Sequence, residues 1–335
     1  MRVINCNDVN EALLKGLSLL TSEGVEIPSR NGPTLEMDTP VATVYENPRN
    51  RVMISKVRDA NPFFHFMESM WVLAGCGDVA FLTEFNKRMA DYSDDGKVFN
   101  APYGQRLMSG FGIDQIESII NTLIRDPNSR QAVGQIWDVA DLERATKDKA
   151  CNMQVVFRMR SGRLDLTVYN RSNDVIWGAY GANVVQFSTL LEYVAAKVGV
   201  PMGTYTQVSN SYHIYLDGPG GDLYNKLLTG YPDINNCNDV TLSQFNQVTM
   251  SAEDMPAFER DLSVFFSVYD SHGLTVLGDT VCWESAYFNK LVMPMLCTFI
   301  IHKAHGASEA LHYVNAIKSS DWYIACFHWL ENRIK

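Results

Sequence analysis

Residues 184–198 constrain the fold more than any other segment, because their side chains are apolar nearly all round a helix. The pattern predicts a central, buried helix that Gly199 ends. Two earlier segments, 155–160 and 163–171, read as strands joined by the hairpin turn signal Ser161–Gly162. The sequence therefore predicts an α+β fold, with a mixed, hairpin-connected sheet packed on helices.

Other segments carry weaker or more local signals. A proline in its first turn and Gly75 at its end mark an apolar helix at 62–74. The signals weaken after about Gly221, and helical patterns return from residue 286 onward. We expect one catalytic domain over residues 1–335, with a core at about 30–215 and a helical C-terminal extension at about 286–335. The further predicted elements are helices at 113–124, 286–304, 308–317 and 321–334, a strand at 131–139 and a turn at 218–221.

Composition excludes several classes of protein. A net charge of −10 over 335 residues argues against a nucleic-acid binder, whereas a few arginines suffice to hold one phosphate. There is no apolar run long enough for a membrane span and no leader pattern, so we expect a cytoplasmic protein without a membrane partner. His302 and His305 lack acidic or cysteine neighbours, so we expect no metal. The seven cysteines are scattered without a CxxC pair, which favours a reducing compartment: Cys6, Cys76, Cys151, Cys237, Cys282, Cys297 and Cys326.

Cys151 is the candidate nucleophile. A cysteine is more often a small buried hydrophobe, and the other six keep that interpretation. A reactive thiolate needs positive charge nearby. Arg171 lies on the polar face of the second hairpin strand, with Asp165, Thr167 and Tyr169, and could supply that charge.

Glu68 is a carboxylate inside the apolar helix at 62–74. One interpretation is a glutamate on an exposed edge of the helix. The other is a buried carboxylate with a pKa raised toward neutrality, which suits proton transfer.

Several polar side chains could hold a phosphorylated ligand. Arg30 lies in a turn-rich loop and Arg130 precedes a strand, and either one alone reads as a solvated surface charge. Guanidinium groups and a hydroxyl such as that of Ser172 match phosphate oxygens well if they converge. His213 and Tyr215 alternate on a short extended run, which by itself reads as a polar strand edge.

Taken in order, these motifs closely resemble the thymidylate synthase and pyrimidine (dUMP or dCMP) hydroxymethylase family. The resemblance covers about residues 30–215, with Arg171 twenty residues after Cys151 as in that family. The matching positions are Arg30, the helix E-S-M-W-V-L at 68–73, Pro102-Tyr103-Gly104, Ser129-Arg130, Cys151, Arg171-Ser172-Asn173-Asp174, Asn183 and His213-Ile214-Tyr215.

The resemblance implies a reaction and a role for each residue. Cys151 would add to C6 of a pyrimidine nucleoside monophosphate, and C5 would then attack the one-carbon unit of the cosubstrate 5,10-methylenetetrahydrofolate. The enzyme would be a homodimer in which Arg130 reaches the partner's phosphate site. The implied roles are proton transfer for Glu68 and Tyr103, catalysis and folate binding for Asp174, folate binding for Trp71, reading of the base for Asn183, phosphate binding for Arg30, Arg130, Arg171 and Ser172, and sugar binding for His213 and Tyr215.

Departures from the synthase pattern favour a hydroxymethylase. Synthases carry Cys-His where this chain has Cys151-Asn152, and their loop before the base-reading amide is one residue shorter than here. The sequence ends without the small apolar tail that closes a synthase over folate, and Asn173-Asp174 resembles the phage dCMP hydroxymethylase pattern. Entry of water would yield a 5-hydroxymethyl product. A phage that modifies its DNA is a consistent source.

Three alternatives stay open. The chain could be a thymidylate synthase that makes dTMP, or a catalytically silent nucleotide-binding regulator. The third alternative concerns the base. An amide at Asn183 suits uracil, so we expect dUMP as the substrate in preference to dCMP. An amide can flip, however, and the longer loop leaves open whether Asn183 aligns with the base-reading amide of the family.

Overall fold

The computed structural model describes residues 1–230, 245–278 and 282–334, so the predicted free Cys237 lies outside the described residues. Its centre is a mixed sheet of eight strands in the order β1-β4-β8-β7-β6-β5, with β3 paired to β8 and β2 to β3. The strands are β1 (Arg2–Cys6), β2 (Val25–Ser29), β3 (Gly32–Glu36), β4 (Val41–Tyr45), β5 (Val133–Gln135), β6 (Asn152–Arg160), β7 (Arg163–Asp174) and β8 (Met202–Tyr215). The α-helices are α1 (Val9–Glu23), α2 (Pro62–Leu73), α3 (Ala80–Phe85), α4 (Tyr103–Gln105), α5 (Gln115–Arg125), α6 (Asn183–Val198), α7 (Gly218–Thr229), α9 (Met255–His272), α10 (Met293–His305), α11 (Ala307–Tyr313) and α12 (Ser320–Glu331).

The predicted hairpin and buried helix are confirmed. Ser161 and Gly162 both have positive φ, 50° and 74°, as a two-residue hairpin turn requires. Strand β7 then pairs in parallel with β8, and the crossover between them is the helix α6. Gly199 ends α6 in the left-handed region.

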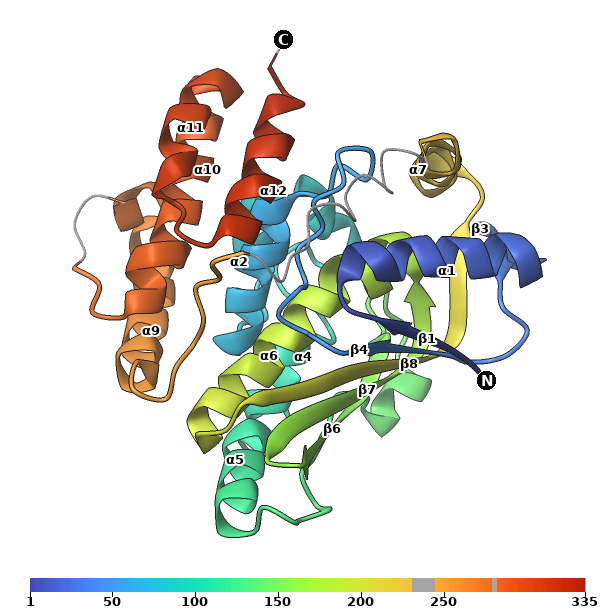
Figure 1. Cartoon of the computed structure of the whole chain (residues 1–335), viewed down its shortest axis with the longest axis horizontal. Helices are drawn as coiled ribbons and strands as arrows, with labels where there is room; N and C mark the ends of the chain where they lie inside the picture. Colours follow the sequence, from blue (N-terminus) through green and yellow to red (C-terminus); the bar gives the residue numbers. More distant parts are fainter. Residues whose placement is uncertain (231–244, 279–281, 335) are drawn as a thin grey trace.

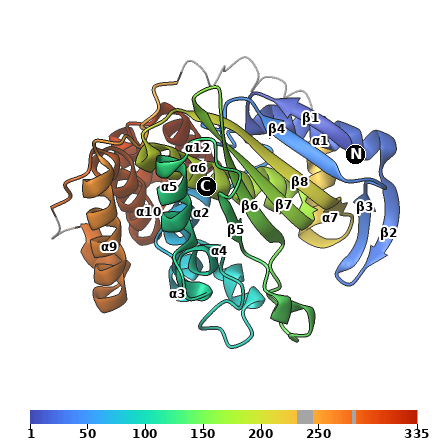
Figure 2. The same cartoon turned by 90° about the horizontal axis from the view of Figure 1, so that it is seen from below.

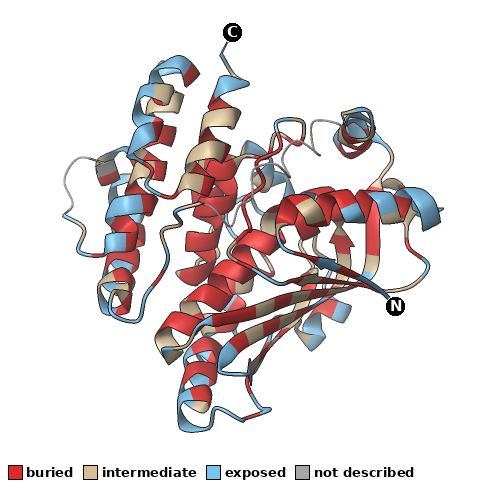
Figure 3. Ribbon diagram, viewed as in Figure 1, coloured by how far each residue is buried: buried red, intermediate tan, exposed pale blue. Residues whose placement is uncertain are grey.

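The sheet has one covered face and one open face. Helices α1, α2 and α6 lie over the covered face (Figure 1), toward which Leu164, Leu166 and Val168 of β7 are fully buried. Thr167 and Tyr169 alternate with them and point the other way, as the sequence predicted, and Tyr169 is 39% exposed. The same alternation of red and paler residues runs along the strands in Figure 3.

The C-terminal helices share the core of the sheet domain through α2. The ring of Phe63 lies 5.4 Å from Phe299 of α10 and 5.5 Å from Trp329 of α12. Phe66 packs edge-on against Trp322 at 5.0 Å. Helices α9, α10 and α12 gather beside α2 on the side of the molecule away from β1 and β2 (Figure 2). The predicted α+β fold with a helical C-terminal region is therefore confirmed, and the shared core supports the expected single domain, whose bounds stay a prediction.

Some local predictions were wrong. Residues 218–221, expected as a turn, begin α7, and Pro219 in its first turn is the signal that could have indicated a helix. The strand expected at 131–139 is shorter, since β5 covers only Val133–Gln135 and Val139 already begins a short 3-10 helix. Helix α9 was not predicted, although Phe258, Leu262, Phe265 and Phe266 recur at helical spacing and form its buried face.

Two features are absent from the described residues. None of the helices combines the length and apolar character that crossing a membrane requires. Within the same residues, no group of three or more His, Cys, Asp or Glu side chains is arranged to hold a metal ion.

Candidate active site

Cys151 and Arg171, which the sequence paired, lie in contact. Cys151 immediately precedes β6, and the backbone N–H of Arg171 on β7 donates to its carbonyl at 2.9 Å. The guanidinium Nη2 of Arg171 lies 3.6 Å from the Cys151 Sγ. Its Nε and Nη2 also donate to the carbonyls of Ala150 and Lys149, at 2.8 and 2.9 Å. The backbone therefore fixes the cation beside the sulfur.

Burial decides the protonation state of the Cys151 thiol. Desolvation raises its pKa above the ordinary value, and the charges of Arg171 and Arg30 oppose that rise while Asp148 adds to it. The expected charge effect of Arg171 is present, but burial outweighs it. The thiol is accordingly protonated at neutral pH, and it needs a base or the polarisation of its target to react.

Tyr103 is held beside Cys151 by a close backbone contact at a glycine. It opens α4, and a Cβ at the next residue, Gly104, would lie 2.1 Å from the Val72 carbonyl oxygen of α2. Only glycine allows this approach. Burial raises the pKa of the Tyr103 hydroxyl far above its usual value, with the charges of Cys151 and Asp148 adding to the rise, and a hydrogen bond with Asn152 opposes it. The phenol is therefore a neutral donor or acceptor.

Glu68 is buried, which rules out the exposed-edge interpretation. It is 6% exposed on α2, and burial raises its pKa from 4.5 to about 8 against an opposing hydrogen bond from Gln186 of α6. The Glu68 Oε2 atom has no hydrogen-bond partner among the described residues. A carboxyl group with a pKa near neutrality and a free oxygen suits proton exchange with a bound water.

The loop before Asn183 forms a kinked π-helical segment. Residues Val175–Ala182 make up this segment, η4, and Tyr180 and Gly181 within it have non-helical backbone angles. Asn183 then begins α6 and faces two buried amides. Its Nδ2 donates to the Asn173 Oδ1 at 3.0 Å, and its Oδ1 accepts from the Asn152 Nδ2 at 3.3 Å. Asn183 is thereby linked to the residue that follows Cys151.

The ends of β7 and β8 bring four more predicted residues together. Their parallel register sets Ser172 opposite Ser211 and Asp174 opposite His213. The His213 Nδ1 lies 3.0 Å from the Ser211 Oγ, and its ring meets Tyr215 edge-on at 5.4 Å. This end of the long strand β8, which the sequence indicated as a short extended run, carries a cluster of polar groups.

Asp174 caps the π-helix. Its Oδ1 accepts from the backbone N–H groups of Ile176 and Trp177, at 2.9 and 2.6 Å. Its Oδ2 is buried and unpartnered in the described part of the chain. Burial raises the pKa of this carboxyl, and the Trp177 N–H and the neighbouring His213 oppose that rise.

The two remaining arginines lie in different places. Arg30 occupies the exposed turn between β2 and β3, where Asn31 Nδ2 is 3.5 Å from the Tyr215 hydroxyl. Arg130 is exposed beyond the far end of β6, where the Phe157 N–H donates to the Ala132 carbonyl. Six residues of extended chain separate Phe157 from Cys151, about 20 Å. Arg130 does not converge on the site of its own chain.

Trp71 lies in the core. It is 4% exposed, its indole N–H donates to Asp78 at 3.1 Å and its ring meets Phe99 edge-on. Its contact with folate stays a prediction. The sequence indicated Asn152 and Asn173 only as motif positions and did not single out the buried Gln186 and Gln207, although amides within or beside apolar segments are a signal for such residues.

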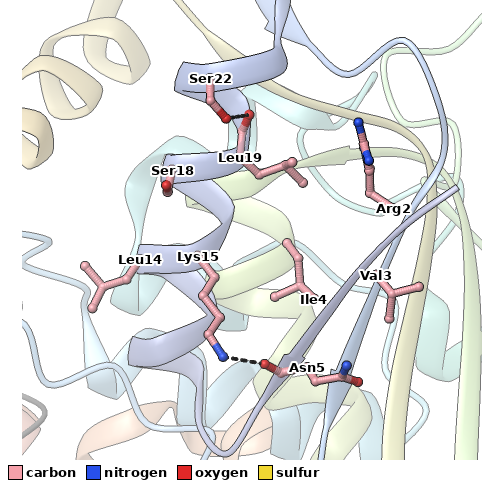
Figure 4. A pocket seen from close by; sticks show the side chains of 9 residues that line it. All are labelled: Arg2, Val3, Ile4, Asn5, Leu14, Lys15, Ser18, Leu19 and Ser22. Atoms are coloured by element: carbon pink, nitrogen blue, oxygen red, sulfur yellow. Dashed lines mark hydrogen bonds between the residues drawn. The ribbon is translucent and has the colours of Figure 1, made fainter.

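A groove separate from these residues lies between β1 and α1 (Figure 4). Lys15 crosses it and donates to the Asn5 carbonyl at 2.7 Å. The nine residues that line it include none of the predicted site residues.

Comparisons with known proteins bear on this arrangement. Residues 18–255 match the family model described as thymidylate synthase. The deoxyuridylate hydroxymethyltransferase of Pseudomonas phage M6 is 39% identical over 352 aligned residues, which cover 99% of this chain and 95% of that protein. The protein of the same name from Bacillus phage SP01 is 42% identical over 62% of this chain and 57% of its own length. A putative thymidylate synthase of Methanosarcina barkeri is 31% identical over 64% of this chain and 89% of its own length.

Proposed function

This chain belongs to the thymidylate synthase family, and from that premise we propose that it is a deoxyuridylate 5-hydroxymethyltransferase that uses 5,10-methylenetetrahydrofolate. The predicted enzyme class, a one-carbon transferase, is confirmed by the family. The observation that carries the proposal is the Cys151 thiol 3.6 Å from a fixed guanidinium. The names of two phage relatives support uracil as the base and hydroxymethyl as the product.

The reaction splits one difficult substitution into easier steps. The Cys151 thiol gives up its proton and its sulfur bonds to C6 of the uracil, which makes C5 nucleophilic. C5 attacks the one-carbon unit, loses its proton, and tetrahydrofolate leaves. Water adds to the exocyclic methylene group, the bond between sulfur and C6 breaks, and 5-hydroxymethyl-dUMP is released.

Glu68 and Tyr103 manage the protons. The unpartnered Glu68 Oε2 and a pKa of about 8 support a carboxyl that both holds and releases a proton through water near neutral pH. Tyr103, whose raised pKa keeps its phenol neutral, helps remove the proton from C5.

The remaining residues bind and orient the substrates. Arg171, Ser172 and Arg30 hold the phosphate, while His213 and Tyr215 hold the sugar hydroxyl. Asn183 reads the base, and Asp174 and Trp71 contact folate. The polar residues at the shared end of β7 and β8 support the nucleotide assignment. The Asp174 Oδ2 has no partner among the described residues, which supports its role as the acceptor of a hydrogen bond from a ligand. We infer an enzyme that acts in the cytoplasm of a phage host.

Product analysis tests this function. Incubation of the enzyme with methylenetetrahydrofolate and dUMP should give 5-hydroxymethyl-dUMP and tetrahydrofolate, identified by mass spectrometry. A methyl product with dihydrofolate would establish a thymidylate synthase instead, the activity that the name of the M. barkeri relative supports. Parallel incubation with dCMP separates the two bases. No turnover with either nucleotide would favour the silent nucleotide-binding regulator.

We infer further that the enzyme is a homodimer with shared active sites. Arg130 lies two residues from Ala132, which is bonded to Phe157, and about 20 Å of extended strand separates Phe157 from Cys151, which places Arg130 too far away to serve the same site. The open face of the sheet carries half-buried or exposed residues, among them Val156, Thr167 and Tyr169. A two-fold axis through this face would bury them and carry Arg130 to the partner's phosphate site.

Mixing of inactive variants tests the shared site. Arg130→Ala and Cys151→Ala should each be inactive as pure dimers. A mixed dimer keeps one intact site, so random exchange at equal amounts should restore about a quarter of the wild-type activity. The exposed Arg125→Ala serves as the matched control and should stay active. Mixed dimers that are demonstrably formed and yet inactive would contradict the arrangement.

A further inference from the structure

We propose that Asn173 and Gln207 lock the side-chain amide of Asn183 in one orientation, and that this lock makes the site select uracil over cytosine. The proposal rests on the proposed function, in which Asn183 reads the base. Asn173 and Gln207 are positioning residues, because they act through Asn183 and not on the substrate directly.

A directed chain of hydrogen bonds starts at a backbone carbonyl. The Gln207 Nε2 donates to the Ala179 carbonyl at 2.8 Å, and the Gln207 Oε1 accepts from the Asn173 Nδ2 at 3.1 Å. The Asn173 Oδ1 accepts in turn from the Asn183 Nδ2 at 3.0 Å. Gln207 and Asn173 are 1% and 2% exposed, so water does not compete with these bonds.

The direction of this chain is fixed because a carbonyl only accepts. If Gln207 flipped, its own oxygen would face the Ala179 carbonyl, and both acceptors would lose a bond. If Asn173 flipped, its oxygen would face the Gln207 oxygen. Each such buried mismatch is costly, so the orientation set at Ala179 passes through Gln207 and Asn173 to Asn183.

The neighbour on the other side of Asn183 does not fix its direction. Asn152 donates to the Asn183 Oδ1, and its own Oδ1 has no partner among the described residues. Its other hydrogen bond is with the Tyr103 hydroxyl, which can donate as well as accept. Asn152 can therefore flip together with Asn183 and keep a bond between them. Ser209, which accepts from the Asn173 Nδ2 at 2.9 Å, is a hydroxyl and can donate as well as accept. The Gln207 Nε2 also lies 3.1 Å from the Tyr45 hydroxyl, which likewise can donate or accept, so the orientation depends on the Ala179 carbonyl acting through Gln207 and Asn173.

The two bases present opposite polarities to such an amide. At the 3 and 4 positions uracil offers a donor and then an acceptor, whereas cytosine offers an acceptor and then a donor. A free amide matches either base by flipping, and a locked amide matches only one. With uracil as the proposed substrate, the locked orientation is the one that rejects cytosine.

Gly178 leaves room for the critical bond. A Cβ at this position would lie 2.8 Å from the Asn173 Oδ1 and 3.3 Å from the Asn183 Nδ2. Alanine there would push against the bond between these two amides without removing a polar group. Gly178→Ala therefore disturbs the lock independently of Gln207.

Base selectivity in matched variants tests the lock. Gln207→Met keeps the volume of the side chain and removes the anchor, and Ser209→Ala removes a partner of Asn173 that does not fix direction. The readout is the ratio of kcat/KM for dUMP to that for dCMP, together with Kd for both nucleotides without folate and the Tm of each variant. We expect Gln207→Met and Gly178→Ala to lower the selectivity about tenfold to a hundredfold through stronger binding of dCMP relative to dUMP. Ser209→Ala should stay within about threefold of the wild type.

The alternatives give different results. If Gln207 has a purely structural role, its loss weakens the binding of both nucleotides alike and leaves the selectivity ratio unchanged, which overturns the proposal. An equal loss of selectivity in Ser209→Ala overturns it as well. If Gln207→Met does not fold, Gly178→Ala decides by the same ratio. Binding without folate reports on the lock even if neither nucleotide is turned over, so failure of the proposed reaction is distinguished from failure of the lock.

Discussion

Cys151→Ala should lose turnover by about 10⁴-fold or more while it still binds dUMP. In the proposed mechanism the reaction proceeds through a bond between the Cys151 sulfur and C6, which alanine at this position cannot form. The phosphate and base contacts do not involve the sulfur, so the dissociation constant for dUMP should change by less than about tenfold. Steady-state kinetics and calorimetric titration measure the two quantities separately.

Covalent trapping makes this prediction specific to one thiol. With 5-fluoro-dUMP and methylenetetrahydrofolate the wild-type enzyme should gain the mass of both ligands on Cys151, because fluorine at C5 cannot leave as the proton does. Cys151→Ala should gain nothing. Cys282→Ser changes an exposed free cysteine and serves as the control that traps normally. An adduct on any other cysteine would exclude Cys151 as the nucleophile.

Glu68→Gln should lower kcat but raise the free energy of unfolding. Glutamine keeps the shape and cannot exchange a proton, so kcat should fall about 10² to 10³-fold. Burial raises the pKa of Glu68 from 4.5 to about 8 in the folded enzyme. Between these two pH values the unfolded chain has released the proton and the folded chain still holds it, so rising pH favours unfolding.

The sign of the pH dependence follows directly. The stability contribution of protonated Glu68 is fully present below pH 4.5 and is lost as the pH rises through about 8. Glu68→Gln carries no such proton, so its advantage in unfolding free energy over the wild type should grow by a few kcal/mol between pH 5 and 8, since one pKa unit corresponds to about 1.4 kcal/mol. Denaturant unfolding at several pH values measures this. Glu117→Gln, at an exposed position of α5, should show neither effect. Equal stability differences at all pH values would mean that Glu68 is not buried as a neutral acid.

Local signals explain which parts of the fold could be predicted. The turn at Ser161–Gly162 and the apolar helix that ends at Gly199 depend on residues close together in sequence, and the structure has both. Helix α7 was missed because its glycine-rich start reads as a turn, although Pro219 in its first turn is a helix signal. Helix α9 was missed although its sequence carries a local signal, since Phe258, Leu262, Phe265 and Phe266 recur at helical spacing.

The sequence by itself determined the chemistry of the site. The order of a cysteine, an arginine twenty residues later, an amide and a His/Tyr pair indicated the family, which the comparisons confirm. Those residue types decide what can be attacked and bound, because nucleophilicity, charge and donor sets belong to the side chains themselves.

Only the tertiary structure decided how those groups are tuned. Segments far away in the chain bury both groups. This burial brings the pKa of Glu68 to about 8, and at Cys151 it raises the thiol pKa more than the charge of Arg171 lowers it. The direction of the Asn183 amide is set at Ala179 and reaches it through Gln207 and Asn173, which lie on two different strands. Desolvation and hydrogen-bond direction depend on what surrounds a group in space, and no periodicity along the sequence records that.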